Sequence, residues 1–134
     1  MIFMDTSAFY ALEVEGDVNH AVARRFLREI REGKHGVMVT TDYVLDETLT
    51  LLRIRHGVSA ALRFLDKVRR SRSIKVVRVD EEVFQRVLSY FKLDGGWRWS
   101  FTDCTSFAVM EMLGIKRAFT FDRDFERAGF TRLP

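Results

Sequence analysis

Short apolar runs alternate along the chain with longer segments in which apolar residues recur at every third or fourth position. The short runs are typical of buried strands, and the longer periodicity is typical of helices that pack on one face. The runs predict five strands, at residues 2–4, 37–39, 74–79, 118–121 and about 131–133.

The periodic segments predict seven helices between these strands. Thr41 and Gly57 are expected to bound one helix, whereas Ser59 and Asp80 are expected to cap the start of two others. Asp94–Gly96 indicates a loop before a helix that is apolar nearly all round and should be buried. The helices are expected at residues 6–12, 21–32, 42–56, 60–68, 81–91, 102–113 and near Phe125.

Strands that alternate with helices predict an α/β fold, built from βαβ units around a mostly parallel sheet of four or five strands. In such folds, ligands bind outside the carboxyl ends of the strands. Asp5, Asp80 and Asp122 each directly follow a predicted strand. These three acids are therefore candidates for a site at that edge of the sheet.

Length and composition indicate one domain, residues 1–134, with a single core. Hydrophobic residues at 47% and charged residues at 31% are typical of a soluble globular protein. No apolar run approaches the roughly 18–20 residues of a membrane helix, and the N-terminal run is too short for a signal peptide. The single cysteine, Cys104, cannot form an intrachain disulfide, so a reducing, cytoplasmic location is expected.

The basic residues are unevenly distributed, although a net charge of +3 alone says little about partners. From Arg63 to Arg78, seven basic residues are opposed only by Asp66. The planar fork of arginine suits phosphate contacts. The charge therefore permits a nucleic-acid partner, and a solvated helix face explains it equally well.

Most of the acids have structural explanations when they are taken singly. Asp5 can cap the first helix, and Asp103 completes the segment Ser100–Asp103, which resembles a capping box. Asp122 and Asp124 can build a turn after a strand. Each of these explanations is sufficient for one residue, and none accounts for the acids as a group.

Glu47 is harder to explain structurally. At about 100° per residue, the apolar positions of its helix define one face, with Glu47 at the edge and Asp46 opposite. A charge near the core needs a partner. Further carboxylates would repel it unless a cation lay between them.

Acids that converge at one end of a parallel sheet favour Mg²⁺ or Mn²⁺, because hard divalent cations prefer carboxylate oxygens. Such ions activate water and stabilise an in-line phosphoryl displacement. Zinc is disfavoured, because one cysteine and three scattered histidines show no ligand spacing.

Four segments carry a resemblance that extends along the whole chain. In this order and in matching elements, they resemble the PIN-domain family, and in particular its VapC-type toxins. The segments are Met4–Ala8, Asp46–Thr48, Trp99–Phe107 and Phe119–Phe125, the last followed by Ala128–Phe130.

The resemblance implies a PIN-like three-layer α/β/α sandwich and a metal-dependent ribonuclease. Its cofactor would be Mg²⁺ or Mn²⁺, held in an acidic catalytic site. The residues that match this site are Asp5, Glu47, Asp103 and Asp122.

The resemblance also implies supporting residues and partners. Thr6, Ser7 and Thr120 would orient carboxylates or waters, and Asp124 would support the site. The substrate would be RNA, and the protein would form a homodimer. As the toxin of a type II toxin–antitoxin system, it would pair with a small antitoxin protein.

Trp97 and Arg98 lie in a Gly-rich segment shortly before Asp103. They are candidates for stacking on unpaired RNA bases and for contacting phosphate. Trp99 is expected to pack against the body of the protein or a dimer partner, and Trp97 is left open between such packing and contact with RNA.

Other functions remain as alternatives. Within the family, the protein could be a housekeeping RNA-processing nuclease or a non-catalytic RNA-binding PIN domain, and the complete acidic set argues against the latter. A receiver-type signalling domain needs an adjacent acid pair after its first strand, whereas here Thr6 follows Asp5.

Overall fold

The computed structural model describes residues 1–93 and 95–134, and its five strands form one sheet. The strands are β1 Ile2–Met4, β2 Met38–Thr41, β3 Ile74–Val77, β4 Arg117–Phe119 and β5 Thr131–Leu133. They lie in the order β3-β2-β1-β4-β5, and each neighbouring pair is parallel. The prediction of a parallel α/β sheet is confirmed.

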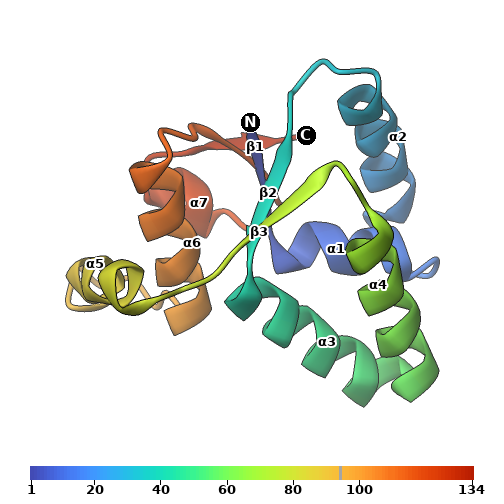
Figure 1. Cartoon of the computed structure of the whole chain (residues 1–134), viewed down its shortest axis with the longest axis horizontal. Helices are drawn as coiled ribbons and strands as arrows, with labels where there is room; N and C mark the ends of the chain where they lie inside the picture. The colour runs from blue at the N-terminus through green and yellow to red at the C-terminus, as the bar shows by residue number, and fades with distance from the viewer. Residues whose placement is uncertain (94) are drawn as a thin grey trace.

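Helices cover both faces of the sheet (Figure 1). Those in the described residues are α1 Thr6–Glu13, α2 His20–Arg31, α3 Asp42–His56, α4 Val58–Arg70, α5 Glu81–Phe91, α6 Phe101–Met112 and α7 Asp124–Arg127. The chain proceeds from β1 out to β3 with α1 to α4 on one face. It then crosses back to β4, and α5 to α7 lie on the other face, which gives the expected α/β/α sandwich.

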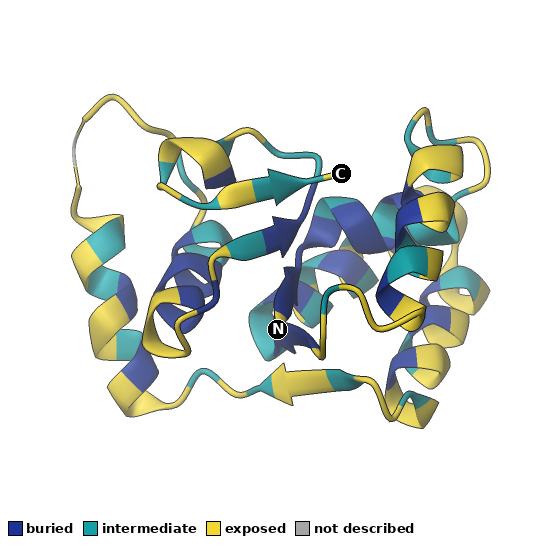
Figure 2. Cartoon of the chain, turned by 90° about the horizontal axis from the view of Figure 1, so that it is seen from above, coloured by how far each residue is buried: buried dark blue, intermediate teal, exposed yellow. Residues whose placement is uncertain are grey.

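The core lies around the central strands, as the apolar runs predicted. Every residue of β1 and β2 is buried, whereas the middle of the edge strand β3 is exposed (Figure 2). Aromatic rings join the layers, and Phe107 of α6 meets Phe125 of α7 edge-on at 5.0 Å between ring centroids. Within the described residues, no helix is long and apolar enough to span a membrane.

Of the helix starts assigned to Thr41, Ser59 and Asp80, those at Thr41 and Asp80 are confirmed and that at Ser59 is wrong. Thr41 and Asp80 each accept a hydrogen bond from the backbone amide three residues later, and so begin α3 and α5. Ser59 does not cap α4, because that helix already begins at Val58. Gly57, with a φ of +90°, both ends α3 and precedes α4, a conformation that favours glycine.

Two strands are shorter than the apolar runs that predicted them. β3 ends two residues early because the amide of Val79 donates to Asp42 Oδ1 at 3.0 Å. β4 also ends early, because the amide of Phe121 donates to Ser7 Oγ at 2.9 Å instead of to a neighbouring strand. Asp94, in the predicted loop, lies outside the described residues.

Candidate active site

The direction of strand succession reverses between β1 and β4, and such a point forms a crevice at the carboxyl ends of the strands. A cavity of about 260 Å³ lies there, and we call it the acidic cavity. Its lining residues are Asp5, Thr6, Ser7, Tyr10, Asp17, Asn19, Glu47, Leu51, Arg55, Asp103 and Asp122. The structure therefore brings together all four acids of the expected site, whereas Asp80 caps α5 outside this lining.

Asp5 is fixed by the hydroxyl groups around it. It directly follows β1 and caps α1, where its carboxylate accepts from the amide of Ser7 at 3.3 Å. Ser7 Oγ and Thr120 Oγ1 each donate to Asp5 Oδ2 at 2.8 Å. These contacts hold the carboxylate in one orientation and tie the ends of β1 and β4 together.

Thr6 belongs to the same turn but has a different environment. Its side chain is buried and lines the acidic cavity. Its Oγ1 has no hydrogen-bond partner within the described part of the chain. A buried hydroxyl without a partner costs free energy, so Thr6 indicates that the cavity accepts a polar occupant.

Asp103 completes a capping box and lines the acidic cavity at the same time. Its Oδ2 accepts from the amide of Ser100 at 3.0 Å, and its own amide donates to Ser100 Oγ at 3.0 Å. Burial raises the pKa of Asp103 to about 7, and the charges of Asp5 and Asp122 add to this, while hydrogen bonds from Ser100 oppose it. The capping role is confirmed, and it does not keep the carboxylate out of the site.

Burial also raises the pKa of Asp5, although the hydrogen bonds from Ser7 and Thr120 act in the opposite direction. Carboxylates that face one another with raised pKa values are destabilised in their ionised form. A divalent cation between them would remove that cost.

Asp122 lies in the turn that connects β4 to α7, and Asp124 is the first residue of α7. Asp122 Oδ1 accepts from the amide of Asp124 at 2.9 Å, which confirms the predicted turn. One carboxylate oxygen from each of Asp103, Asp122 and Asp124 lies within 4.8 Å of the other two. Asp124 lies outside the described lining of the cavity, and its Oδ1 also accepts from Arg127 at 2.6 Å, so it backs the other two acids.

Glu47 enters the acidic cavity from the middle of α3. It is half-buried, whereas its neighbour Asp46 is exposed. The buried face of the helix is formed by Val44, Thr48 and Leu52. The edge position that helical geometry predicted for Glu47 is therefore the one observed.

The donor set of the acidic cavity fits a hard divalent cation. Its four expected acids offer carboxylate oxygens, and its described lining contains neither histidine nor cysteine. Mg²⁺ and Mn²⁺ prefer such oxygen ligands and usually retain several waters. Asp5, Glu47, Asp103 and Asp122 line the cavity and could hold the ion. Within the described residues, the group whose carboxylate oxygens lie nearest one another is Asp103, Asp122 and Asp124, so Asp124 could contribute as well.

The cavity also contains residues that the sequence did not single out, among them Tyr10, Asp17 and Arg55. Arg55 follows Glu47 by eight residues, and this spacing places both on one side of α3. This eight-residue spacing can be read directly from the sequence. Asp17 lies between α1 and α2, and no pattern in the sequence places this segment at the cavity.

The tryptophan pair lies elsewhere. Trp99 packs edge-on against Phe107 at 5.1 Å between ring centroids, as expected. Trp97 stacks on Trp99 with ring centroids 6.0 Å apart and planes 4° from parallel, and Arg127 lies over its ring. Trp97 remains 46% exposed, and neither it nor Arg98 belongs to the described lining of the acidic cavity.

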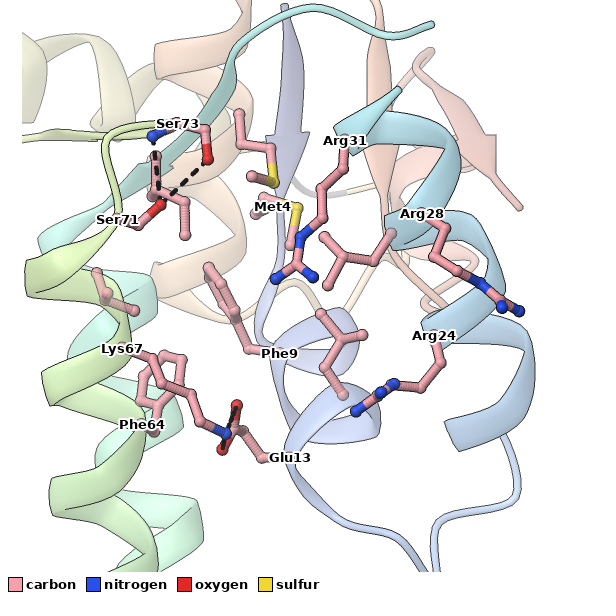
Figure 3. Close-up of a pocket in the computed structure, with 15 residues that line it drawn as sticks. Met4, Phe9, Glu13, Arg24, Arg28, Arg31, Phe64, Lys67, Ser71 and Ser73 are labelled. Atoms are coloured by element: carbon pink, nitrogen blue, oxygen red, sulfur yellow. Dashed lines mark hydrogen bonds and ion pairs between the residues drawn. The ribbon is translucent and has the colours of Figure 1, made fainter. Parts of the chain in front are cut away.

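A second cavity, of about 450 Å³, lies between α1, α2 and α4 (Figure 3). Its floor is apolar, and there Phe9 meets Phe64 edge-on at 5.1 Å between ring centroids. Lys67, at its rim, contacts Glu13 at 2.9 Å. We call it the basic cavity, because its rim also carries the α2 side chains Arg24, Arg28 and Arg31.

Comparison with known proteins places this geometry in a family. The family model of the PIN domain matches residues 2–131. The chain belongs to the PIN-domain family. The resemblance stated from the sequence motifs is thereby confirmed.

Relatives of this PIN domain are named as ribonucleases. It is 38% identical over 133 residues to VapC20 of Mycobacterium tuberculosis, a 23S rRNA-specific endonuclease, and the match covers 99% of this chain and 98% of that protein. It is 33% identical over 116 residues to a VapC ribonuclease of Archaeoglobus fulgidus, covering 84% and 72% of the two chains.

A solved structure confirms the fold. The crystal structure of M. tuberculosis VapC20, described as a sarcin–ricin loop cleaving toxin, matches this PIN domain with a TM-score of 0.87 at 37% sequence identity. The match covers 98% of this chain and 97% of the other.

Proposed function

We propose that this PIN-domain protein is an endoribonuclease that hydrolyses RNA phosphodiester bonds with Mg²⁺ or Mn²⁺, and that it is the toxin of a type II toxin–antitoxin system. The observation that carries the proposal is the convergence of four carboxylates at the reversal point of the sheet. The relatives named as VapC ribonucleases support RNA as the substrate class. Because one is named for 23S rRNA, ribosomal RNA is the first substrate to test.

The proposed mechanism assigns separate tasks to the residues of the acidic cavity. A bound Mg²⁺ or Mn²⁺ would polarise the phosphate and lower the pKa of the attacking water. Asp5 and Asp103 would be the principal ligands, and Ser7 and Thr120 prevent the Asp5 carboxylate from rotating by donating hydrogen bonds to its Oδ2. Thr6 offers its unpartnered Oγ1 to a water or a phosphate oxygen.

The metal requirement has a direct test. Cleavage of a single-stranded RNA in Mg²⁺ or Mn²⁺ should disappear in excess EDTA and return when either ion is restored. Mn²⁺ should also raise the melting temperature of the wild-type protein, because it binds only the folded site, and this rise should be absent in Asp5→Asn. Robust cleavage in excess chelator would overturn the metal mechanism.

The toxin assignment is tested in cells. Expression of the wild-type chain alone should arrest growth, whereas Asp5→Asn should not. The proposed antitoxin would lay its tail across the acidic cavity and insert a basic side chain, because a cation there relieves the repulsion between the acids. If the wild-type protein accumulates harmlessly in an RNA-cleaving form, the housekeeping RNA-processing function replaces the toxin.

The remaining expectations belong to the same proposal. The complete set of carboxylates argues against a non-catalytic RNA-binding PIN domain. The family resemblance supports a homodimer, which light scattering on the purified protein would test. The single cysteine is buried and supports a cytoplasmic location.

A further inference from the structure

We propose that Arg55 binds an RNA phosphate that flanks the scissile one, with Tyr10 holding its guanidinium in place. This inference rests on the proposed ribonuclease function and deepens it, because it names a substrate-binding residue of the same cavity. Its basis is the position of Arg55 on α3, the charge of the cavity, and the contacts that restrain the side chain.

Arg55 lies on the same side of α3 as Glu47, about two turns further along the helix. Glu47, Leu51 and Arg55 follow one another at intervals of four residues, and all three line the acidic cavity. With a rise of about 1.5 Å per residue, Arg55 lies about 12 Å along the helix from Glu47. The backbone of Arg55 is therefore about two helical turns away from that of Glu47, and its Cζ lies over the ring of Tyr10. This position suits a phosphate next to the scissile one.

The charge of the acidic cavity creates a need for such a residue. Its described lining contains five acids, namely Asp5, Asp17, Glu47, Asp103 and Asp122, and Arg55 is the one Lys or Arg within it. These acids repel the phosphates of an approaching RNA wherever the bound cation does not neutralise them. A fixed guanidinium at the edge of the cavity supplies attraction where the cation cannot.

Arg55 is restrained without being neutralised. Its Cζ lies over the ring of Tyr10, 5.5 Å from the centroid, and Tyr10 Oη in turn hydrogen-bonds His56 Nε2 at 2.9 Å. No ion pair joins Arg55 to an acid within the described residues. An arginine stacked on an aromatic face keeps its N–H edges free, and those edges match the geometry of a phosphate.

A structural explanation is also available, because a basic residue in the last turn of a helix favours the helix dipole. Arg53 provides the matched control for this effect. It is exposed in the same last turn, about 200° around the helix from Arg55, and outside the described lining of the acidic cavity. Arg53→Gln removes the same charge from the same helix end without touching the proposed contact.

The first arm of the test measures binding of a fluorescent single-stranded RNA to proteins that carry Asp5→Asn to prevent cleavage. Adding Arg55→Gln should weaken binding about tenfold and lower the slope of log affinity against log salt by about 0.7, the value for one lost phosphate contact on a single strand. Arg55→Lys should retain the slope and only part of the affinity, because it keeps the charge but not the planar fork. Arg53→Gln should change the affinity less than about twofold.

The second arm measures cleavage in the otherwise wild-type protein. Arg55→Gln should raise KM about tenfold and change kcat less than about twofold. A contact with a flanking phosphate is equally strong in the bound substrate and in the transition state, so its loss weakens both alike. The inference is overturned if Arg55→Gln and Arg53→Gln behave alike, or if kcat falls while KM is unchanged. A wild-type protein that binds RNA without cleaving it defeats the ribonuclease proposal, and the binding arm still decides the role of Arg55. Absence of RNA binding by the wild-type protein defeats both.

Discussion

The acidic cavity and the basic cavity lie on different faces of α1 and differ in almost every physical respect. Thr6, Ser7 and Tyr10 face the former, whereas Phe9 and Leu12 face the latter. The basic cavity is the larger, at about 450 Å³ against about 260 Å³. It has an apolar floor and a cationic rim, and Glu13 is the one acid in its described lining.

The difference shows that volume does not identify the site of chemistry. In the basic cavity, the basic groups project from α2 and α4 at the rim, and Lys67 already has a partner in Glu13 of α1. In the acidic cavity, like charges face one another and the pKa values of Asp5 and Asp103 are raised. A cation bound between such groups would relieve their repulsion, and perturbed carboxylates in a cleft are typical of active sites.

The largest effect is expected from a change at the base of the acidic cavity. Asp5→Asn should lower kcat for RNA cleavage about a thousandfold, equivalent to about 4 kcal/mol, because the charge that holds the cation is lost. Asparagine also caps helices well, and burial already disfavours the Asp5 charge, so the melting temperature in EDTA should be maintained or rise. Loss of folding would instead favour a purely capping role.

A matched change in the basic cavity gives the contrast. Arg28 is exposed at the rim, so Arg28→Gln should fold normally and retain kcat within about twofold. A drop comparable to that of Asp5→Asn would break the comparison, because it would place part of the RNA-cleaving machinery in the basic cavity. Both variants would be assayed with the same RNA and metal.

A smaller but sharper effect separates two neighbours on α3. Glu47→Gln should lower kcat about a hundredfold, equivalent to about 2.7 kcal/mol, since its carboxylate faces the acidic cavity. Asp46→Asn should remain nearly wild-type, because that side chain is exposed to water. Equal activities of the two variants in a steady-state cleavage assay would show that the helix-facing argument is wrong.

The arrangement behind these predictions is largely readable from the sequence. Apolar runs followed directly by Asp5 and Asp122 placed both acids at strand ends, and the rule for parallel sheets placed those ends together. Helix geometry alone distinguished Glu47 from Asp46. For Asp103, the residues by themselves favoured a capping box, and only the resemblance to PIN domains pointed to the site as well.

Interactions between distant segments could not be predicted from periodicity, although the resemblance to PIN domains named Ser7 and Thr120 as residues that orient carboxylates. Thr120 reaches Asp5 across 115 positions of the chain, and Ser7 ends β4 early by accepting from the amide of Phe121. No periodicity or local motif encodes contacts of this length. The stacking of Trp97 on Trp99 is a short-range contact, and the sequence left it open because the Trp97 ring could equally face RNA. Arg55 could have been found by extending the helix phase of Glu47 by two turns.

The smallest effect expected is on stability, and it depends on pH. Burial raises the pKa of Asp103 in the folded protein to about 7, well above its ordinary value of 3.8. A carboxyl whose pKa is higher in the folded state stabilises folding fully below the unfolded pKa, and this contribution is lost as pH rises toward 7. The side chain of Asp103→Asn cannot ionise, so the variant does not lose stability in this way. Its amide oxygen can still accept the hydrogen bond from the backbone amide of Ser100. Relative to wild type in EDTA, its unfolding free energy should therefore increase between about pH 4 and pH 7 and then level off. One pKa unit corresponds to about 1.4 kcal/mol, and partial exposure of the side chain to water reduces the expected gain to about 1–2 kcal/mol.

Urea titrations of wild type, Asp103→Asn and the exposed control Asp46→Asn at pH 4.5, 6 and 8 would measure this gain in the free energy of unfolding. A gain that is constant with pH, or equal in the control, would show that Asp103 is not destabilised by its place in the acidic cavity.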